Sequence, residues 1–514
     1  MGIPYYFYKL SQKYNNIISN NKPNNTDIFC IDFNGIIHNV AQKHIYNADY
    51  ADIENIIIEG VWEKIELYIK EYQASKYIIC ADGVAPVAKM FQQRKRRYLT
   101  IYKNKIDADN IKKSYWDTNA ITPGTNFMNK LNTFINKKIR YSTYQANIIY
   151  SGSDENGEGE HKIFKMLKLE NDNNDIIING LDADLIILSL ISRKNNIYLM
   201  RESIERETGE LVKNYLNIDN LKKAILNEVK IKWELNINNT SSDDNDDNDI
   251  IETYCTMISI LGNDFLPHLL TIDLKTDGID KILYAAKQSI NEYGLLVKDG
   301  VINYDTLKNI FKYLSTSEDN DIHNICEKYI NKKEGISKLP SDNYALKNKD
   351  KLCYYIYNNP GNWHKEYYKS IFSNNITIDS TVMFNACNNY IIGIYWVYQY
   401  YKGINVDNEW YYPYNYPPTI KDLTNHSIAY SEPIINTNTD FVPYYIQLLI
   451  VLPRESSHLL NNKYKNYMSD IYMGLFHMYP LNYTIQTFLK TQLWECSPIL
   501  PLININYIKK IIYN

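Results

Sequence analysis

Short apolar runs alternate with amphipathic stretches through the first half of the chain. Five runs have the length and composition of buried strands: Ile28–Asp32, Tyr77–Ala81, Ala146–Tyr150, Asp175–Asn179 and Asn196–Met200. Helix-like segments flank each of them, and this alternation is typical of an α/β domain with a mainly parallel sheet between helices. Ligands of such sheets bind beyond the carboxyl ends of the strands, so we expect the chemistry of this protein there.

The pattern changes along the 514 residues, which are enough for two regions with buried cores. We assign residues 1–285 to the α/β domain and residues 343–514 to a second, mostly helical α+β region packed on it. Residues 286–342 are polar and read as an irregular connector. The tract 236–249 is acidic and of low complexity, which predicts a solvated loop inside the first domain.

Composition narrows the class of protein. The formal net charge is −4, which argues against a coat protein that binds nucleic acid through overall positive charge. Seven scattered cysteines without a CxxC pair predict reduced, buried thiols rather than a disulfide framework or a zinc site. No apolar run reaches membrane-spanning length, and the N-terminus lacks the apolar core of a signal peptide. We therefore expect a cytoplasmic protein without a membrane partner.

Acidic residues follow the predicted strands, where a parallel sheet would bring them together. They are Asp32, Asp82, Glu158, Glu160, Asp182 and Asp184, with Asp264 after a buried helix. Each alone could be a helix cap or could favour the start of a helix. Gathered at one edge, however, they repel one another unless a cation neutralises them. Two Mg²⁺ ions, with Mn²⁺ as a substitute, would suit such carboxylates and would hold the reacting oxygens of a phosphodiester hydrolysis.

A basic segment follows Asp82 directly. Residues 80–140 contain 13 Lys and Arg against 4 Asp. In the predicted helix, Lys89, Gln93, Arg96 and Arg97 share one face. A solvated charge run would have the same composition, but the position just past an acidic strand end favours a phosphate-binding face. Arg forks bind a terminal phosphate through two parallel bonds.

The motifs that carry these residues resemble a known family. In chain order they read MGIPYYFYKLSQKY, CIDFNGIIH, ADGVAPVAKMFQQRKRRY, NAITPGTNFM, SGSDENGEGEHKI, GLDADLIILSL and LGNDFLPHL. They are similar to the motifs of the 5′→3′ exoribonucleases of the Xrn family, and YWVYQYYKG, WYYPYNYPP, LLIVLPRESSHLL and LWECSPILPLI resemble that family's second conserved region. The resemblance runs from Gly2 to about Leu502.

The resemblance implies a PIN-like or flap-nuclease-like core and Mg²⁺-dependent, processive 5′→3′ hydrolysis of single-stranded RNA to mononucleotides. It places the seven acids in the active site and Lys89, Gln93, Arg96 and Arg97 in a pocket for a 5′-monophosphate, thought too tight for a cap or triphosphate. Decapped RNA would be the substrate, and the decapping machinery a partner of this expected monomer. His38 matches a residue that stacks on the first bases, although an ordinary histidine after a strand would look the same. The segment 2–4 resembles the element that admits single strands and blocks duplexes.

The chain also departs from the family pattern. Near the WYYP-type motif the family has two tryptophans, whereas Asn408 stands near the first position here and Trp410 remains as the candidate stacking partner. The 48 tyrosines reflect A/T-rich codon usage, but eight of them, with two tryptophans, fall within residues 391–416. We expect that cluster to form a packing wall behind the site.

The chain ends with the second region and contains no Cys/His knuckle, so it is similar to compact members such as those of large cytoplasmic DNA viruses. Two other functions remain open at this point. One is a structure-specific 5′ flap nuclease acting on DNA, which uses a similar acidic sheet edge. The other is a catalytically inert RNA-binding or scaffold protein, since a fold can outlive its chemistry. The intact set of acids disfavours the second.

Overall fold

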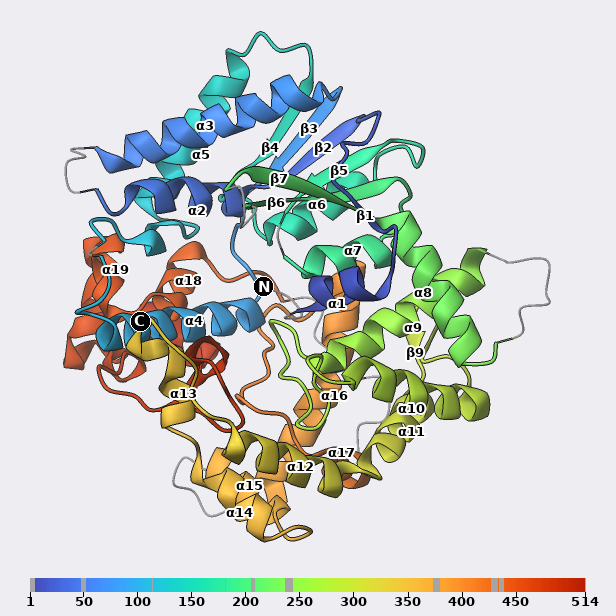
Figure 1. The fold of residues 1–514 in the computed structure, drawn as a ribbon. Coiled ribbons are helices and arrows are strands. Elements are labelled where there is room, and N and C mark those ends of the chain that lie inside the picture. Colours follow the sequence, from blue (N-terminus) through green and yellow to red (C-terminus); the bar gives the residue numbers. More distant parts are fainter. Residues whose placement is uncertain are drawn as a thin grey trace.

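A seven-stranded sheet organises the first half of the molecule (Figure 1). The computed structural model describes residues 5–47, 52–112, 114–180, 182–204, 209–235, 244–372, 380–426, 433 and 439–513. The strand order is β1-β7-β6-β5-β2-β3-β4. The bounds are β1 Ile18–Ser19, β2 Ile28–Asp32, β3 Lys76–Cys80, β4 Asn147–Ser151, β5 Ile176–Asn179, β6 Ile197–Ile204 and β7 Leu211–Asn217. Strands β2 to β6 pair in parallel, which confirms the predicted α/β class.

All five predicted strands are present, with small shifts of their ends. Strands β1 and β7 were not predicted, and both pair antiparallel at one edge of the sheet. Strand β7 begins at an exposed position, continues through three intermediate positions and is buried only at Tyr215 and Leu216, so it lacks the continuous apolar run that predicts a buried strand. The unpredicted strands therefore extend the sheet on the side away from β3 and β4.

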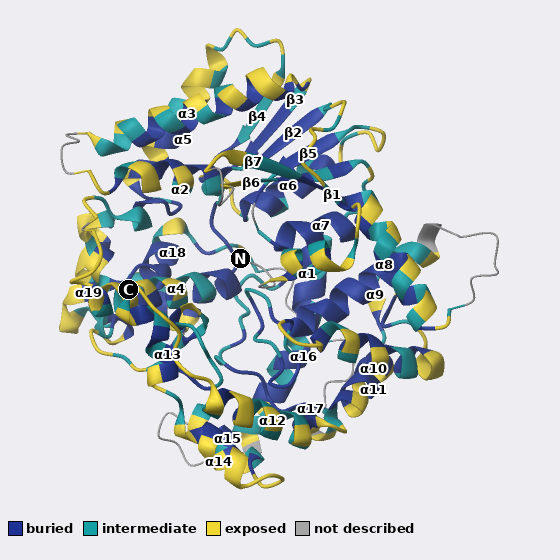
Figure 2. Cartoon of the chain, viewed as in Figure 1, coloured by how far each residue is buried: buried dark blue, intermediate teal, exposed yellow. Residues whose placement is uncertain are grey.

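Helices cover both faces of the sheet, because the central strands are apolar on both sides. In β2, Ile28 and Cys30 belong to one buried cluster, while Phe29 and Ile31 belong to another. Figure 2 shows the buried strands between helical layers with exposed outer faces. The helices of this half are α1 Tyr6–Lys13, α2 Phe33–His44, α3 Ile53–Tyr72, α4 Val87–Ile106, α5 Asn126–Arg140, α6 Gly159–Leu167, α7 Asp184–Ile191 and α8 Ile218–Lys232.

The second half is mostly helical, with two short hairpins. Its helices are α9 Asp244–Ile258, α10 Gly278–Tyr293, α11 Tyr304–Ser315, α12 Glu318–Asn331, α13 Tyr344–Lys347, α14 Lys351–Asn358, α15 His364–Phe372, α16 Ser380–Lys402, α17 Ile420–His426, α18 Tyr444–Val451, α19 Asn462–Ser469 and α20 Ile505–Tyr513. Strands β8 Val297–Lys298 and β9 Val301–Ile302 form one hairpin, and β10 Ile485–Gln486 pairs with β11 Ser497–Pro498.

Two expectations about the middle of the chain are wrong. The supposed connector 286–342 contains the second half of α10 and all of α11 and α12. In α11, Leu307, Ile310, Phe311 and Leu314 are buried, a helical spacing that the polar residues between them obscured.

The acidic tract 236–249 is also helical from Asp244 onward. Acidic residues are favourable at the N-terminal end of a helix, which explains why such a polar sequence starts α9. Residues 236–243 lie outside the described part of the chain.

The two halves share their interior. Helix α16 contributes Tyr390, Trp396 and Tyr400 to the buried cluster that also contains one face of the sheet. Glu252 of α9 is buried and accepts hydrogen bonds from Arg193 Nη2 (2.9 Å), Tyr398 OH (2.6 Å) and Lys402 Nζ (2.9 Å). Full pairing of a buried carboxylate removes most of the cost of desolvating it. α16 is thus held firmly against the sheet domain.

Helix α4 joins the sheet edge to the C-terminal helices. Val87, Met90 and Phe91 pack with Ile446 and Leu449 of α18 in a separate buried cluster. On the same helix, the Arg94 guanidinium is buried and donates to the carbonyl oxygens of Met478 and Pro501. These contacts fix one side of α4, which leaves its other side to face the middle of the molecule (Figure 1).

The cysteine side chains agree with the prediction of reduced, buried thiols. The seven cysteines are free and buried. Among the described residues, none of the helices combines the length and apolar character needed to cross a bilayer.

Gly83 gives a test of the turn that follows β3. A Cβ atom there would lie 1.7 Å from the carbonyl oxygen of Glu155, because this turn pairs tightly with the loop before α6. We expect Gly83→Ala to lower the free energy of unfolding in urea by at least about 2 kcal/mol, since backbone would have to move. The control Gly35→Ala has open space and lies in α2, so it should be neutral or stabilising by about 0.5 kcal/mol. Equal stability of the two variants would contradict this packing.

Candidate active site

The carboxyl ends of the parallel strands bring the predicted acids together. Asp32 ends β2, Asp82 follows β3, Glu158 and Glu160 start α6 after β4, and Asp182 follows β5. Six of the seven acids, Asp264 among them, line one cavity of about 910 Å³. The seventh, Asp184, is 2% exposed and lies beside the cavity wall in the first turn of α7.

Hydrogen bonds fix the orientation of Asp82. Its Oδ2 accepts from Asn34 Nδ2 at 2.8 Å, and its Oδ1 accepts from the backbone N–H of Gly159 at 2.7 Å. A side chain at position 159 would lie 2.8 Å from the Cys80 carbonyl oxygen and 3.3 Å from Asp32 Oδ1. The glycine therefore allows the start of α6 to approach two strand ends closely.

The simple alternative, that these acids are helix caps, does not fit the geometry. Asp32 and Glu158 occupy the N-cap positions of α2 and α6, yet neither side chain makes a capping hydrogen bond. The N-cap residue of α7 is Ala183, so Asp184, the next residue, is not the cap of that helix. Six of the seven carboxylates line the cavity instead.

Mutual repulsion changes the pKa values of the cluster. Burial, and then the charges of Asp82 and Asp182, raise the pKa of Asp32. Burial and Glu158 raise the pKa values of Asp82 and Glu160, and burial and Asp264 raise the pKa of Asp184 to about 7. Raised acid pKa values mean that the site favours a positive charge.

Lys89 supplies that charge within the chain itself. Its Nζ lies 2.5 Å from Glu158 Oε2 and 2.9 Å from Asp264 Oδ2. The lysine is 9% exposed, and the acids raise its pKa well above the usual value against the effect of burial. At Asp264 burial would raise the pKa, but Lys89 outweighs it and lowers the value to about 2. Lys89 begins the basic face of α4 and also belongs to the acidic cluster, because the first turn of that helix starts at the sheet edge.

Two tyrosines of the second half complete the cluster. Tyr400 OH donates to Glu158 Oε1 at 2.6 Å, and Tyr401 OH donates to Asp184 Oδ1 at 2.6 Å. Both are buried at the end of α16, more than 200 residues from their partners. We expected a packing wall in this segment but not hydroxyl groups bonded to the acids, since sequence order gives no sign of such a distant pairing.

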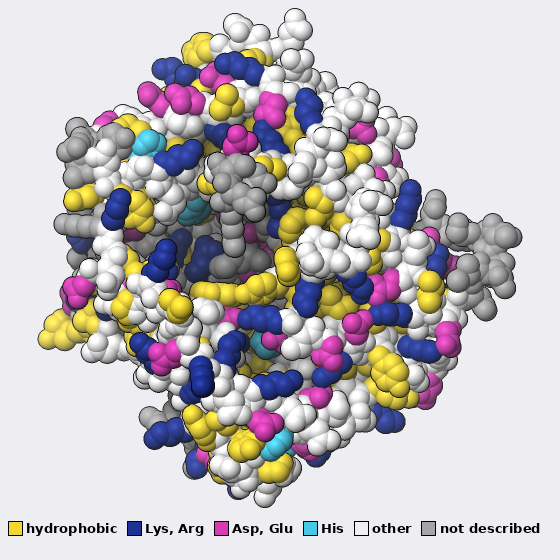
Figure 3. Space-filling model, viewed as in Figure 1, with side chains coloured by type: hydrophobic (Ala, Val, Ile, Leu, Met, Phe, Trp, Pro, Cys, Tyr) yellow, Lys and Arg dark blue, Asp and Glu magenta, His cyan; other side chains and the backbone are white. Residues whose placement is uncertain are grey.

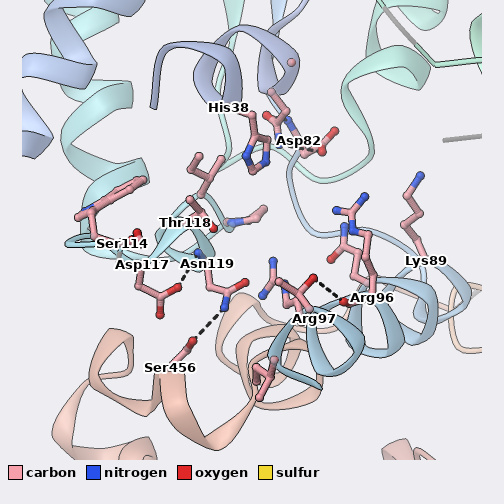
Figure 4. Close-up of a pocket in the computed structure, with 18 of the residues that line it drawn as sticks. His38, Asp82, Lys89, Arg96, Arg97, Ser114, Asp117, Thr118, Asn119 and Ser456 are labelled. Carbon is pink, nitrogen blue, oxygen red and sulfur yellow. Dashed lines mark hydrogen bonds between the residues drawn. The ribbon is translucent and has the colours of Figure 1, made fainter. Parts of the chain in front are cut away.

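The basic face of α4 lines the same cavity. Figure 4 shows Arg96 and Arg97 between Lys89 on one side and Asp117 and Asn119 on the other. Arg97 Nη2 donates to Thr122 Oγ1 at 2.7 Å, while its Nη1 is buried without a hydrogen-bond partner. Burial and the charge of Arg96 lower the pKa of the Arg97 guanidinium. An unpaired guanidinium N–H beside a second cation forms a receptor for an anion.

The surface around the cavity matches this charge distribution. On the face drawn in Figure 3 the molecule is hollowed left of centre, and Lys and Arg side chains lie around the hollow. Although the chain as a whole is slightly acidic, positive charge is concentrated where the cavity opens. Local charge of this kind attracts a polyanion without making the whole protein basic.

His38 extends over the cavity from α2 (Figure 4). Burial, followed by the charges of Arg96 and Arg97, lowers the pKa of its imidazole to about 4. The ring is therefore neutral at physiological pH. A neutral flat ring above two guanidinium groups suits contact with a base rather than with a phosphate.

The structure does not bring Trp410 to the cavity. Its ring stacks on Trp396 at a centroid distance of 5.2 Å, packed against the shared core, and it is not among the cavity-lining residues. Asn408 binds Thr439 through its side chain, and its carbonyl oxygen accepts from Val87 N–H at the start of α4. The aromatic residues that do line the cavity are Tyr115 and Trp116. Residues 2–4, expected to exclude duplexes, lie outside the described part of the chain.

Metal coordination is not preformed. Across the described residues, no three Asp, Glu, His or Cys side chains converge closely enough to hold a metal ion as they lie here. Lys89 pairs with two of the acids at that position. The donors are nevertheless all carboxylates, the ligands of hard divalent cations.

An acidic edge of a parallel sheet beside buried guanidinium groups is an arrangement suited to chemistry on phosphate esters. Comparison with protein families agrees. Residues 1–203 match the family model of the XRN 5′-3′ exonuclease N-terminus, and residues 244–353 and 347–511 match that of the Xrn1 helical domain. The chain belongs to the Xrn family of 5′-3′ exonucleases.

Curated relatives support this assignment. The chain is 27% identical to 5′-3′ exoribonuclease 1 of Homo sapiens, over 98% of this chain and 33% of that protein. It is 25% identical to 5′-3′ exoribonuclease 1 of Schizosaccharomyces pombe, over 98% of this chain and 48% of that protein. It thus spans a third to a half of the length of these two relatives. Both are eukaryotic proteins, and the expected viral origin stays a prediction.

Lys89→Met tests the internal cation. In metal-free buffer at neutral pH the variant leaves Glu158 and Asp264 buried without their cationic partner, so we expect the free energy of unfolding in urea to fall by about 3 kcal/mol. The control is Lys95→Met on the same helix. Within the described chain Lys95 has no carboxylate partner and donates to Asn415 Oδ1 at 3.4 Å, so the loss should be below about 1 kcal/mol. Equal losses would contradict a special role for Lys89.

Proposed function

We propose that this chain hydrolyses single-stranded RNA with a 5′-monophosphate, processively from the 5′ end, and releases mononucleotides. One observation carries the proposal: a single cavity holds both an anion receptor and an acidic sheet edge. The names of the relatives, 5′-3′ exoribonucleases, support the direction and the RNA substrate. A 5′-phosphate bound next to the acids would place the first phosphodiester bond of the RNA at the acids, so that cleavage releases one nucleotide.

The position of each residue in the cavity indicates its proposed role. Arg96 and Arg97 bind the 5′-phosphate, with Gln93 beside them on the same face of α4. Lys89 lies between this face and the acids, so it is placed to contact either group of oxygens. His38 stacks on a terminal base, and stacking is tolerant of sequence, as an enzyme that degrades any RNA requires. Cleavage creates a new 5′-phosphate for the same receptor.

Two Mg²⁺ ions, with Mn²⁺ as a substitute, are the proposed cofactors. The seven acids Asp32, Asp82, Glu158, Glu160, Asp182, Asp184 and Asp264 would hold them, and the ions would supply an activated water and neutralise the leaving oxygen. The raised pKa values of Asp32 and Glu160 support this reading, because burial and the neighbouring carboxylates both disfavour their charged forms, which a bound cation would stabilise. For the ions to bind, Lys89 must release Glu158 and Asp264.

The state of the cysteines bears on the cellular compartment. Free, buried cysteines favour a reducing compartment, so we propose the cytoplasm. We also propose that the protein acts as a monomer, with the acids and the basic face of α4 in one cavity of a single chain. Decapped RNA as the substrate would place the protein after the decapping machinery.

Removal of Asp182 and Asp184 tests the acidic site. We expect Asp182→Ala with Asp184→Ala to slow decay of end-labelled, 5′-phosphorylated RNA in Mg²⁺ at least about 100-fold, because two carboxylates next to the reacting phosphate are lost. The matched control is Asp109→Ala with Asp172→Ala, exposed residues away from the cavity. Full activity of the Asp182/Asp184 variant would refute the site. A 5′-flapped DNA duplex in the same assay separates RNA decay from flap cleavage.

Arg96→Ala with Arg97→Ala tests recognition of the end. Wild type should degrade 5′-phosphorylated RNA at least about tenfold faster than 5′-hydroxyl RNA, since charge-assisted bonds to phosphate are strong. In the double variant we expect the two rates to become equal, while Lys103→Ala, at the far end of α4, keeps the difference. A preference that survives the loss of both arginines would exclude this receptor.

A further inference from the structure

Helix α16 reaches the acidic edge from the second half of the chain and bonds to two of its carboxylates. Tyr400 OH donates to Glu158 Oε1 and Tyr401 OH donates to Asp184 Oδ1, both at 2.6 Å. Glu158 follows β4 and Asp184 follows β5, and the sheet places β2 and β3 between those two strands. Pairing between neighbouring strands therefore does not join the two carboxylates directly. The end of α16, which packs on α7, joins them instead (Figure 1).

Packing fixes the two tyrosine rings, each of which is 7% exposed. The ring of Tyr400 lies between those of Trp396 and His161, at centroid distances of 4.8 and 3.9 Å. Phe265 packs edge-on against both tyrosines, at 5.3 Å from Tyr400 and 6.3 Å from Tyr401. A buried ring with neighbours on several sides has little freedom to change its rotamer. Each hydroxyl group is therefore a fixed donor to its carboxylate.

The two partners of Glu158 differ in charge. Lys89 Nζ lies 2.5 Å from Glu158 Oε2, whereas Tyr400 bonds to Oε1. A divalent cation among the acids would repel the ammonium group of Lys89 but not a neutral hydroxyl group. Tyr400 can therefore stay bonded to Oε1 while Oε2 changes its partner. Tyr401 bonds to an acid outside the two described ion pairs of Lys89, so its bond does not depend on that exchange.

We propose that Tyr400 and Tyr401 are positioning residues whose hydroxyl groups hold Glu158 and Asp184 in the orientation that binds a divalent cation. The inference rests on the proposed function and gives the second half of the chain a task in it. Each hydroxyl group engages one of the two oxygens of its carboxylate. Hydrogen-bond donors behind metal-binding side chains fix the orientation of those side chains, and their loss commonly lowers metal affinity about 10- to 100-fold.

Binding of Mn²⁺ without RNA tests the two hydroxyl groups. Tyr400→Phe and Tyr401→Phe each keep the packed ring and remove the donor. We expect the dissociation constant for Mn²⁺, measured from the EPR signal of the free ion, to rise about tenfold in each variant. Binding that is lost in Asp182→Ala with Asp184→Ala counts as binding at the acids. Loss of a hydrogen bond alone would make the carboxylate more basic and a better ligand, so unchanged or tighter binding in either variant would refute the role of that tyrosine.

Tyr398→Phe is the matched control, because it removes the same type of bond from the same helix. Tyr398 OH donates to Glu252 Oε2 at 2.6 Å, and Glu252 is buried away from the cavity. We expect the dissociation constant for Mn²⁺ to stay within about twofold of wild type, since sites without shared partners act independently. An equal loss of affinity in Tyr398→Phe, Tyr400→Phe and Tyr401→Phe would mean that α16 only supports the fold, and would overturn the proposal.

The Mg²⁺ dependence of RNA decay gives a second readout. In Tyr401→Phe we expect the Mg²⁺ concentration for half-maximal rate to rise about tenfold, while the rate at saturating Mg²⁺ stays within about threefold of wild type. Excess cation can restore occupancy of a misoriented site, whereas it cannot repair a damaged fold. A rate that is reduced equally at every Mg²⁺ concentration would contradict the positioning role.

Metal binding measured without RNA keeps this test apart from the test of the function. If wild type binds Mn²⁺ at the acids and the two tyrosine variants bind it about tenfold more weakly, but no RNA is degraded, the proposed function fails and the positioning role stands. If wild type degrades RNA and both tyrosine variants bind Mn²⁺ as tightly as wild type does, the positioning role fails alone.

Discussion

The ion pairs of Lys89 with Glu158 and Asp264 are the interaction on which the rest of the site depends. Seven acids gathered at one sheet edge would repel one another, and a buried cation from the first turn of α4 offsets that repulsion within the chain. The same helix continues into the arginines of the receptor. One element therefore offsets the repulsion at the acidic edge and fixes the distance from that edge to Arg96 and Arg97.

The second half of the chain is part of the site rather than an addition to it. Tyr400 and Tyr401 reach the acids from α16, while α18 packs behind α4 and holds the cationic face toward the cavity. Asn408 joins the two by accepting the first N–H of α4. An isolated sheet domain would lack these supports. The site therefore depends on both the sheet domain and the helical region, which together make up nearly the whole chain.

Local pattern predicted the sheet and its acids because both depend on short-range properties. A run such as that of β2 is buried on both sides, so its end and its Asp32 could be placed from sequence alone. The hydrogen bonds of Tyr400 and Tyr401 to the acids and the ion pair of Lys89 with Asp264 depend on contacts between segments far apart, for which one sequence holds no signal. The helices within 286–342 were missed for another reason, since their buried residues are spaced among polar ones. Trp410 was expected at the RNA and instead packs on Trp396.

The most direct measurement is the position of a divalent cation relative to the bound RNA end. Crystals of the chain soaked with Mn²⁺ and a 5′-phosphorylated oligoribonucleotide would locate the metal by anomalous scattering. The account predicts manganese among the seven acids, Lys89 released from Glu158 and Asp264, and the terminal phosphate on Arg96 and Arg97. Manganese absent from the acids at saturating concentration, with Lys89 still paired to both, would contradict it.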